Sequence, residues 1–143
     1  MGVFTFDQQV RFADCDTAGI MFYPRLFEMF QRTVEEWFAT GLGMDYREYH
    51  MDRGWGMPLV RCECDFMAPS VLGDMVTFSL WLERLGTKSF TLRQAMSKNG
   101  KDRARARMIM VTVENDGQKA IPIPDILRPR MEEFLEPERM KGR

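Results

Sequence analysis

The feature that most constrains the fold is a wide apolar stripe at helical spacing that begins just after a proline. Its main members are 4, 4 and 3 residues apart, so they share one face of a helix: Leu26, Phe30, Val34 and Trp37. Pro24 suits the first turn of a helix, where its missing N–H costs no hydrogen bond. The pattern predicts a helix from Pro24 to about Thr40, ending before Gly41, with an apolar surface wide enough to require cover from the rest of the chain.

The sequence after residue 58 changes to apolar and polar residues in alternation, which is typical of strands with one buried face. Strands are expected over residues 60–66, 76–82, 89–97 and 102–114, with a hairpin turn at Asn99-Gly100. An earlier strand is expected over residues 3–13, and a short helix over 44–51. These elements predict an α+β domain in which a five-stranded antiparallel sheet curls around one long helix.

A chain of 143 residues is expected to form a single domain, residues 1–143. The tail from about residue 121 contains four prolines. It is expected to carry one short helix near residues 131–135 and then to fray.

Composition excludes several classes of protein. The 20 basic and 21 acidic side chains give a net charge of −1, which argues against a nucleic-acid-binding role. Three cysteines without framework spacing fit a reducing compartment, and with no signal segment or membrane span we expect a cytoplasmic location and no membrane partner. A single histidine is too few for the usual zinc sites, so no metal is expected.

Two acidic residues, Asp14 and Asp16, stand just before the predicted helix and are separated from it by Gly19 and the pair Phe22-Tyr23. A helix start offers free N–H groups and a positive dipole end, which can polarise a carbonyl while a nearby carboxylate attacks it or activates water. Asp16 is the candidate for this chemistry, and the alternative is that its carboxylate only shapes the turn. Asp14 is expected to brace the loop.

The block from Asp14 to Ile20, followed by Phe22-Tyr23-Pro24, resembles the signature of hotdog-fold acyl-CoA thioesterases, in particular the 4-hydroxybenzoyl-CoA thioesterase branch. Residues 56–60 and 88–90 also fall at the family's spacing, so the resemblance covers about residues 10–113. It implies a long helix wrapped by an antiparallel sheet. The implied reaction is hydrolysis of an aromatic or short-chain acyl-CoA to free acid and CoA, with no cofactor.

The resemblance also assigns roles by position. Asp16 matches the catalytic carboxylate, as nucleophile or general base, and the Tyr23 backbone N–H matches the group that polarises the thioester carbonyl. Lys88 and Ser89 match positions that contact the CoA nucleotide or phosphates, and the arginines of the stripe at 103, 105 and 107 are either further phosphate contacts or a solvated strand face. The remaining substrate-binding candidates, some of them acting across a subunit boundary, are Gly19, Phe22, Trp55, Met57, Pro58, Leu59 and Val60.

Other functions stay open from the residues alone. A non-catalytic acyl-CoA-binding module would bind acyl-CoA without releasing CoA. A hotdog hydratase or dehydratase would need a histidine base, and His50 lies in no matching motif. Because one sheet around one helix leaves an outer face and an edge strand open, we expect a homo-oligomer, either a dimer with a continuous sheet or a tetramer.

Overall fold

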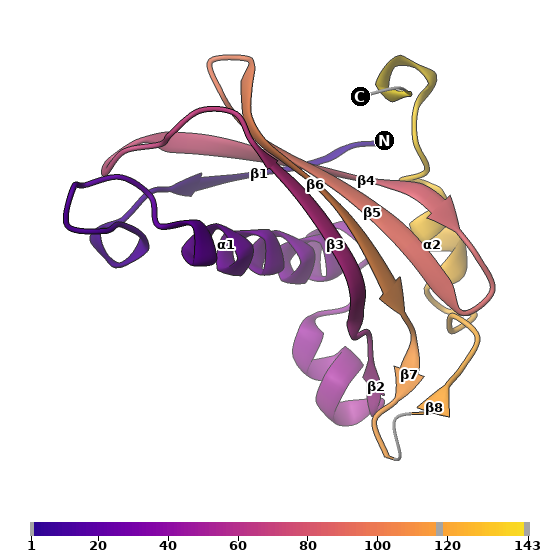
Figure 1. Cartoon of the computed structure of the whole chain (residues 1–143). Coiled ribbons are helices and arrows are strands. Elements are labelled where there is room, and N and C mark those ends of the chain that lie inside the picture. The colour runs from indigo at the N-terminus through magenta and orange to yellow at the C-terminus, as the bar shows by residue number, and fades with distance from the viewer. Residues whose placement is uncertain (1, 117–118, 142–143) are drawn as a thin grey trace.

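The computed structural model describes residues 2–116 and 119–141. Its main body is a five-stranded antiparallel sheet in the order β1-β4-β5-β6-β3, which curls over one long helix, α1 (Figure 1). The strands are β1 (Phe4–Gln9), β3 (Leu59–Phe66), β4 (Met75–Leu85), β5 (Ser89–Lys98) and β6 (Lys101–Val111). The predicted α+β architecture is confirmed.

Helix α1 (Tyr23–Glu36) continues into a π-helical turn, η2 (Trp37–Gly41), and together they match the predicted helix. A second π-helical turn, η3 (Glu48–Asp52), lies where the short helix was expected. The smaller elements are η1 (Phe12–Asp14), β2 (Trp55–Gly56), β7 (Val113–Glu114), β8 (Lys119–Ala120), α2 (Arg128–Glu132) and η4 (Glu138–Met140). Strands β2, β7 and β8 form a second small sheet. No helix in the described ranges combines the length and apolarity needed to cross a bilayer.

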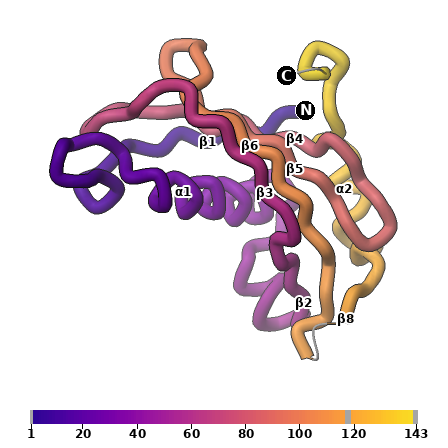
Figure 2. The backbone as a smooth tube through the Cα atoms, viewed as in Figure 1, coloured from indigo at the N-terminus to yellow at the C-terminus, as the bar shows by residue number. Residues whose placement is uncertain are grey.

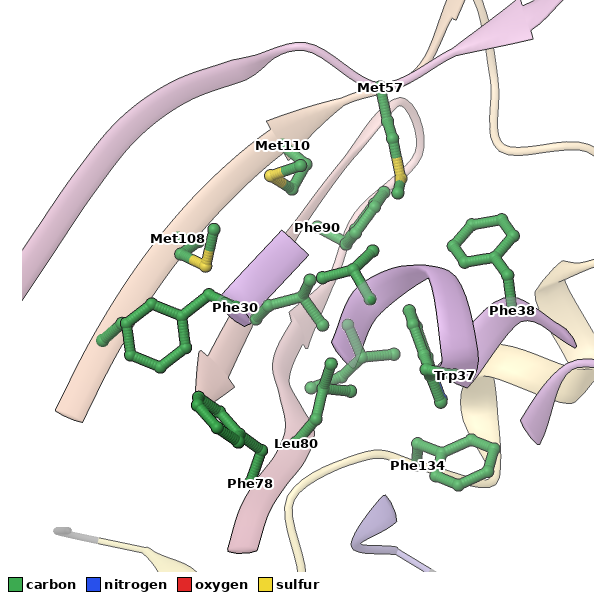
Figure 3. Packing of buried hydrophobic residues seen from close by; sticks show 14 of the residues in the cluster. Phe30, Trp37, Phe38, Met57, Phe78, Leu80, Phe90, Met108, Met110 and Phe134 are labelled. Atoms are coloured by element: carbon green, nitrogen blue, oxygen red, sulfur yellow. The ribbon is translucent and has the colours of Figure 1, made fainter. Parts of the chain in front are cut away.

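The core lies between α1 and the concave face of the sheet (Figure 3). All four residues of the predicted helical stripe are buried, and Phe30 meets Phe78 of β4 edge to face with ring centroids 5.5 Å apart. The hairpin between β5 and β6 turns at Asn99 and Gly100, whose φ angles of 53° and 76° are those of a type I′ turn. The sequence prediction was therefore right for the elements that hold α1 in place.

The first strand is shorter than predicted. It ends at Gln9, and Phe12 is 83% exposed in the 3-10 turn that follows. The Arg11 N–H donates to Asp14 Oδ2 (2.9 Å), a local bond that competes with strand pairing. The apolar alternation across residues 10–12 was therefore misread.

The tail does not fray after its short helix, which also begins earlier than predicted, at Arg128. The Leu82 N–H donates to Phe134 O (2.8 Å), and the Glu136 N–H donates to Leu82 O (2.7 Å). Met140 then packs against Trp81 on the outer face of the sheet. The tail is held because its prolines separate apolar side chains that join both clusters, namely Ile123, Leu127, Met131, Phe134 and Met140.

Candidate active site

Asp16 lies in a tight, exposed turn between η1 and α1, residues 16–21, which we call the acid turn. Its N–H donates to Ile20 O (2.9 Å), its carbonyl accepts from the Gly19 N–H (3.0 Å), and its Oδ1 accepts from the Ala18 N–H (2.8 Å). Gly19 has a φ of +74°, which favours glycine at this position. The turn uses Oδ1, and no donor within the described ranges contacts Oδ2, so this oxygen remains available for chemistry.

Asp14 is buried and holds the same loop from within. Its Oδ2 accepts from the Arg11 N–H (2.9 Å), and its backbone carbonyl accepts from the Phe22 N–H (2.8 Å). Its Oδ1 lies 3.9 Å from the Arg32 guanidinium. Since the Asp14 carboxylate is only 5% exposed and its contacts are internal, the geometry matches the bracing role predicted for it.

Helix α1 begins at Tyr23 with a free donor. Phe22 adopts extended backbone, and its carbonyl accepts from the Arg25 N–H (2.9 Å). Pro24 has no N–H, and the Tyr23 N–H has no acceptor in the part of the chain that the structure describes. This N–H is one of the orphan groups of a helix start, where the helix dipole also favours negative charge.

An apolar cavity of about 610 Å³ opens beside the start of α1. Its walls come from the acid turn, the first turn of α1, strands β3, β5 and β6, and the connection between β3 and β4: Ile20, Met21, Tyr23, Leu26, Phe66, Met67, Ala68, Pro69, Ser70, Met96, Arg103 and Ala104. Apart from Tyr23, and Arg103 as a candidate phosphate contact, none of these was among the predicted site residues. The sequence carries no local signal for them, because the β3–β4 connection reaches the acid turn only through long-range contacts.

That connection, residues 67–74, pairs with the acid turn through backbone hydrogen bonds (Figure 2). The Met21 N–H donates to Ser70 O (2.8 Å), and the Leu72 N–H donates to Gly19 O (2.9 Å). Both bonds flank the Asp16–Ile20 turn, so the connection fixes the outer side of the candidate site.

The other predicted site residues lie at the opposite end of the molecule, around β2 and the β4–β5 turn (Figure 1). Ser89 pairs with Val111 on one side of β6, and the Val111 N–H donates to Pro58 O (3.2 Å) on the other side, so β6 separates Lys88 and Ser89 from the segment that holds Met57 and Pro58. Trp55 packs edge to face on Tyr49 at this end, and Leu59 and Val60 are exposed at the start of the edge strand β3. Within one chain, therefore, Gly19, Phe22 and Tyr23 lie with Asp16, whereas residues 55–60 and 88–89 do not.

A smaller pocket of about 280 Å³ lies at this far end, between η3 and β7. It contains a polar contact that the sequence did not indicate, because its partners are 65 residues apart: Asn115 Nδ2 lies 3.0 Å from His50 Nδ1 and donates to Trp55 O (2.9 Å). Met57 and Pro58 line the same pocket.

The arginine stripe of β6 is paired with carboxylates. Arg103 contacts Asp74 (3.1 Å), Arg105 contacts Asp102 (2.8 Å) and Arg107 contacts Glu83 (2.7 Å). The stripe is therefore an ion-paired face rather than the solvated strand face that was the alternative, and its pairing argues against a role in binding CoA phosphates.

The cysteine beside the candidate acid is unsuited to nucleophilic chemistry. Burial, and then the charges of Asp14 and Asp16, raise the pKa of the Cys15 thiol above its usual value. A raised pKa lowers the thiolate fraction at neutral pH, so the Asp16 carboxylate remains the candidate reactive group of this loop.

The sequence profile of the thioesterase-like superfamily matches residues 10–133. The chain belongs to this superfamily. The match confirms the predicted resemblance to hotdog-fold acyl-CoA thioesterases and, with it, the predicted enzyme class.

Individual relatives extend the comparison. The chain is 30% identical to a 4-hydroxybenzoyl-CoA thioesterase from a Pseudomonas species over 84% of this chain and 91% of that protein. It is 29% identical to a 1,4-dihydroxy-2-naphthoyl-CoA hydrolase from Synechococcus elongatus, over 90% and 94% of the two chains. The solved structure of a gentisyl-coenzyme A thioesterase superposes with a TM-score of 0.79 at 29% identity, covering 89% of this chain and 98% of that one.

Proposed function

We propose that this protein hydrolyses an aromatic acyl-CoA thioester to the free acid and CoA at the Asp16 turn. The observation that supports this most directly is one juxtaposition: a carboxylate with a free oxygen and an unpaired Tyr23 N–H occur on the loop that enters α1, beside an apolar cavity. Such an arrangement combines a nucleophile or base with an electrophilic donor and a place for the acyl group.

In the proposed reaction the thioester carbonyl oxygen accepts a hydrogen bond from the Tyr23 N–H. Asp16 Oδ2 then follows one of two routes. It attacks the carbonyl carbon, so that the C–S bond breaks and an acyl anhydride forms, which water cleaves; or it removes a proton from water that attacks the same carbon. In both routes CoA leaves as a thiolate and takes a proton. One donor to a developing oxyanion typically contributes about 10²- to 10³-fold in rate.

The aromatic class of substrate is supported by the cavity and the relatives together. Phe66, Met67 and Met96 give the cavity an apolar, polarisable lining that suits a ring. The names of the three relatives refer to hydroxybenzoyl, dihydroxynaphthoyl and gentisyl thioesters, and each of these acyl groups is a hydroxylated ring.

The proposed site is completed by a second copy of the chain. Strand β3 is at the edge of the sheet, with exposed Leu59 and Val60 at its start and exposed Phe66 at its end. Antiparallel pairing of two β3 strands would place the start of one beside the end of the other. Residues 55–60 and 88–89 of one copy would then approach the cavity and Asp16 of its partner.

The test is an assay of thiol release from a panel of thioesters: 4-hydroxybenzoyl-CoA, 1,4-dihydroxy-2-naphthoyl-CoA, benzoyl-CoA and hexanoyl-CoA. We expect kcat/KM for at least one aromatic substrate to exceed that for hexanoyl-CoA about tenfold or more, which is about 1.4 kcal/mol of transition-state discrimination. Saturable binding of these thioesters without release of CoA would overturn the proposal in favour of an acyl-CoA-binding module. Hydration of crotonyl-CoA without thiol release would favour a hydratase.

A further inference from the structure

We propose that Asp74 and Arg103 are a positioning pair, which holds the acid turn so that Asp16 and the Tyr23 N–H keep their reactive geometry. The inference rests on the proposed function, because it concerns the same site. Neither side chain is assigned a part in the chemical steps, and both act through the β3–β4 connection, residues 67–74.

Asp74 is buried at the end of that connection, just before β4. Its Oδ2 accepts from the Val71 N–H (3.0 Å) and from Arg103 (3.1 Å), and its Oδ1 accepts from Lys98 Nζ (2.6 Å). Its carboxylate therefore links the connection both to β5, through Lys98, and to β6, through Arg103. A buried carboxylate that bridges two cations and a backbone donor strongly favours a single arrangement of its neighbours.

Arg103 holds the other part of the connection. Its guanidinium donates to Pro69 O (2.8 Å), and its backbone carbonyl accepts from the N–H groups of Met67 (2.8 Å) and Ala68 (3.2 Å). The same side chain lines the candidate cavity. The two side chains therefore contact the connection at Pro69 and Val71, and the Arg103 backbone holds Met67 and Ala68 beside them.

The fixed connection in turn holds the acid turn on both sides of Asp16. On one side the Val10 N–H donates to Asp74 O (2.8 Å), and the Gly73 N–H donates to Val10 O (2.8 Å). On the other side lie the bonds of Ser70 and Leu72 to the acid turn described above. Because the Asp16 N–H is itself bonded to Ile20 O, a shift of the connection would move the carboxylate.

Glu83 offers a matched comparison within the same sheet. It is also a partly buried carboxylate between two arginines, Arg107 (2.7 Å) and Arg93 (3.1 Å). It lies on β4 at a position where none of its hydrogen bonds reaches the acid turn or residues 67–74. Loss of charge at Glu83 should therefore cost stability without moving Asp16.

The experiment compares Asp74→Asn with Glu83→Gln in the full chain. Steady-state kinetics with 4-hydroxybenzoyl-CoA are combined with amide hydrogen exchange over residues 18–23. For Asp74→Asn we expect kcat to fall about tenfold and KM to stay within about threefold of the wild-type value. Amide exchange over residues 18–23 should become about tenfold faster. For Glu83→Gln we expect all three to stay within about twofold. Equal losses of kcat in both variants, or no loss in Asp74→Asn, would overturn the inference.

Two further variants keep the test decisive. Asp74→Glu retains the charge and should recover part of kcat, whereas a purely volumetric role would not show this rescue. If Asp74→Asn does not fold, Arg103→Lys takes its place. Lysine keeps the positive charge but lacks the planar guanidinium that donates to Pro69 O, so kcat should fall as for Asp74→Asn while KM stays similar. If the wild-type protein releases no CoA from any thioester, the proposed function fails. The exchange data then decide the inference alone, because unchanged exchange over residues 18–23 would overturn it.

Discussion

The two ends of the protomer carry different parts of the proposed chemistry. At the acid-turn end, Asp16 and the Tyr23 N–H lie beside an apolar cavity of about 610 Å³. At the far end, a smaller pocket of about 280 Å³ has polar walls at His50 and Asn115, and Lys88 is exposed nearby. The first end is suited to a reaction at a carbonyl, and the second to recognition of a polar, charged group.

Under the proposed function, this difference implies that the site needs a second copy of the chain. A CoA thioester combines a compact acyl group with a long, charged nucleotide portion. In the proposed reaction the acyl group would lie at the acid-turn end and the phosphates at the far end, and these two ends are on opposite sides of one protomer (Figure 1). The following predictions test the acid-turn end, the sheet edge that would join two copies, and the far end.

The largest effect is expected at the acid turn. Asp16→Asn keeps the acceptor for the Ala18 N–H but removes the reactive carboxylate, so kcat should fall about 10²-fold or more with little change in Tm. Asp14→Ala leaves the Arg11 N–H without its acceptor and should cost about 1–3 kcal/mol of stability. Kinetics and thermal unfolding of both variants measure the contrast. An Asp16→Asn enzyme within threefold of wild-type turnover would contradict the role of Asp16.

The next prediction concerns the need for two chains. Glu63 is exposed on the edge strand β3 and forms an ion pair with Arg61 (2.8 Å). Glu63→Lys would give this edge an excess of positive charge, and in a β3-to-β3 dimer the two edges would repel each other. We expect the dimer dissociation constant to rise about tenfold and activity per chain to fall as the dimer dissociates. Sedimentation and dilution assays measure both.

The control for the edge variant is Glu114→Lys, an equal change of charge on the exposed strand β7, away from the edge of the main sheet. It should leave the dimer intact. A fully active monomer of either variant would show that the far end of a second copy is not needed.

A smaller effect is expected at the far end. Lys88 is exposed in the β4–β5 turn, and Lys88→Glu should raise KM about tenfold at low salt while leaving kcat nearly unchanged. Added salt should reduce the difference, since it screens exposed charges. Lys101→Glu, an exposed lysine at the start of β6, serves as the control. Equal effects of the two substitutions would argue against a specific contact with CoA at Lys88.

The smallest effect is expected from acid. Bonds from Lys98 and the Val71 N–H lower the pKa of Asp74 against a smaller effect of burial. The bond from Arg107 lowers the pKa of Glu83 most, burial opposes it, and the bond from Arg93 lowers it further. A carboxyl group whose pKa is lower in the folded than in the unfolded state stabilises the fold. This contribution is fully present at pH values above the pKa of the unfolded state. That stability is lost as pH falls through the folded pKa, so Tm should drop below about pH 4.

Thermal unfolding between pH 7 and pH 3 measures this loss. Asp74→Asn and Glu83→Gln should each show a shallower drop than the wild-type protein. At the acid-turn end, hydrogen exchange over residues 18–23 should accelerate with acid more in the wild-type protein than in Asp74→Asn, once the intrinsic pH dependence of exchange is subtracted. If exchange over residues 18–23 accelerates equally with acid in the wild-type protein and in Asp74→Asn, the charge of Asp74 does not stabilise the acid turn.

Local patterns were enough to predict the framework. The stripe from Leu26 to Trp37 and the alternation in β3 to β6 each depend on near neighbours, and the Asn99-Gly100 turn has its own sequence signal. The family signature then selected Asp16 and Tyr23. The cavity walls could not be predicted, because Ser70 bonds to Met21, about 50 positions earlier, and Arg103 bonds to Pro69, 34 positions earlier, and no periodicity encodes such contacts.

The tail illustrates the same limit. Its prolines predicted an irregular segment correctly, but the bonds of Phe134 and Glu136 to Leu82 depend on an unpaired stretch of β4 that only the folded sheet presents. A proline-rich sequence alone does not distinguish a frayed tail from one packed irregularly against a sheet.

The three tryptophans differ in burial, so intrinsic tryptophan fluorescence can report on ligand binding at one end of the molecule. Trp37 and Trp81 are enclosed by the core and by the tail, so their fluorescence should be insensitive to events at the surface. Trp55 is half-buried at the far end, with the Arg53 guanidinium 5.5 Å from its ring. A change in emission on adding CoA would therefore come chiefly from Trp55, so ligand arrival at that end could be followed without labelling the protein.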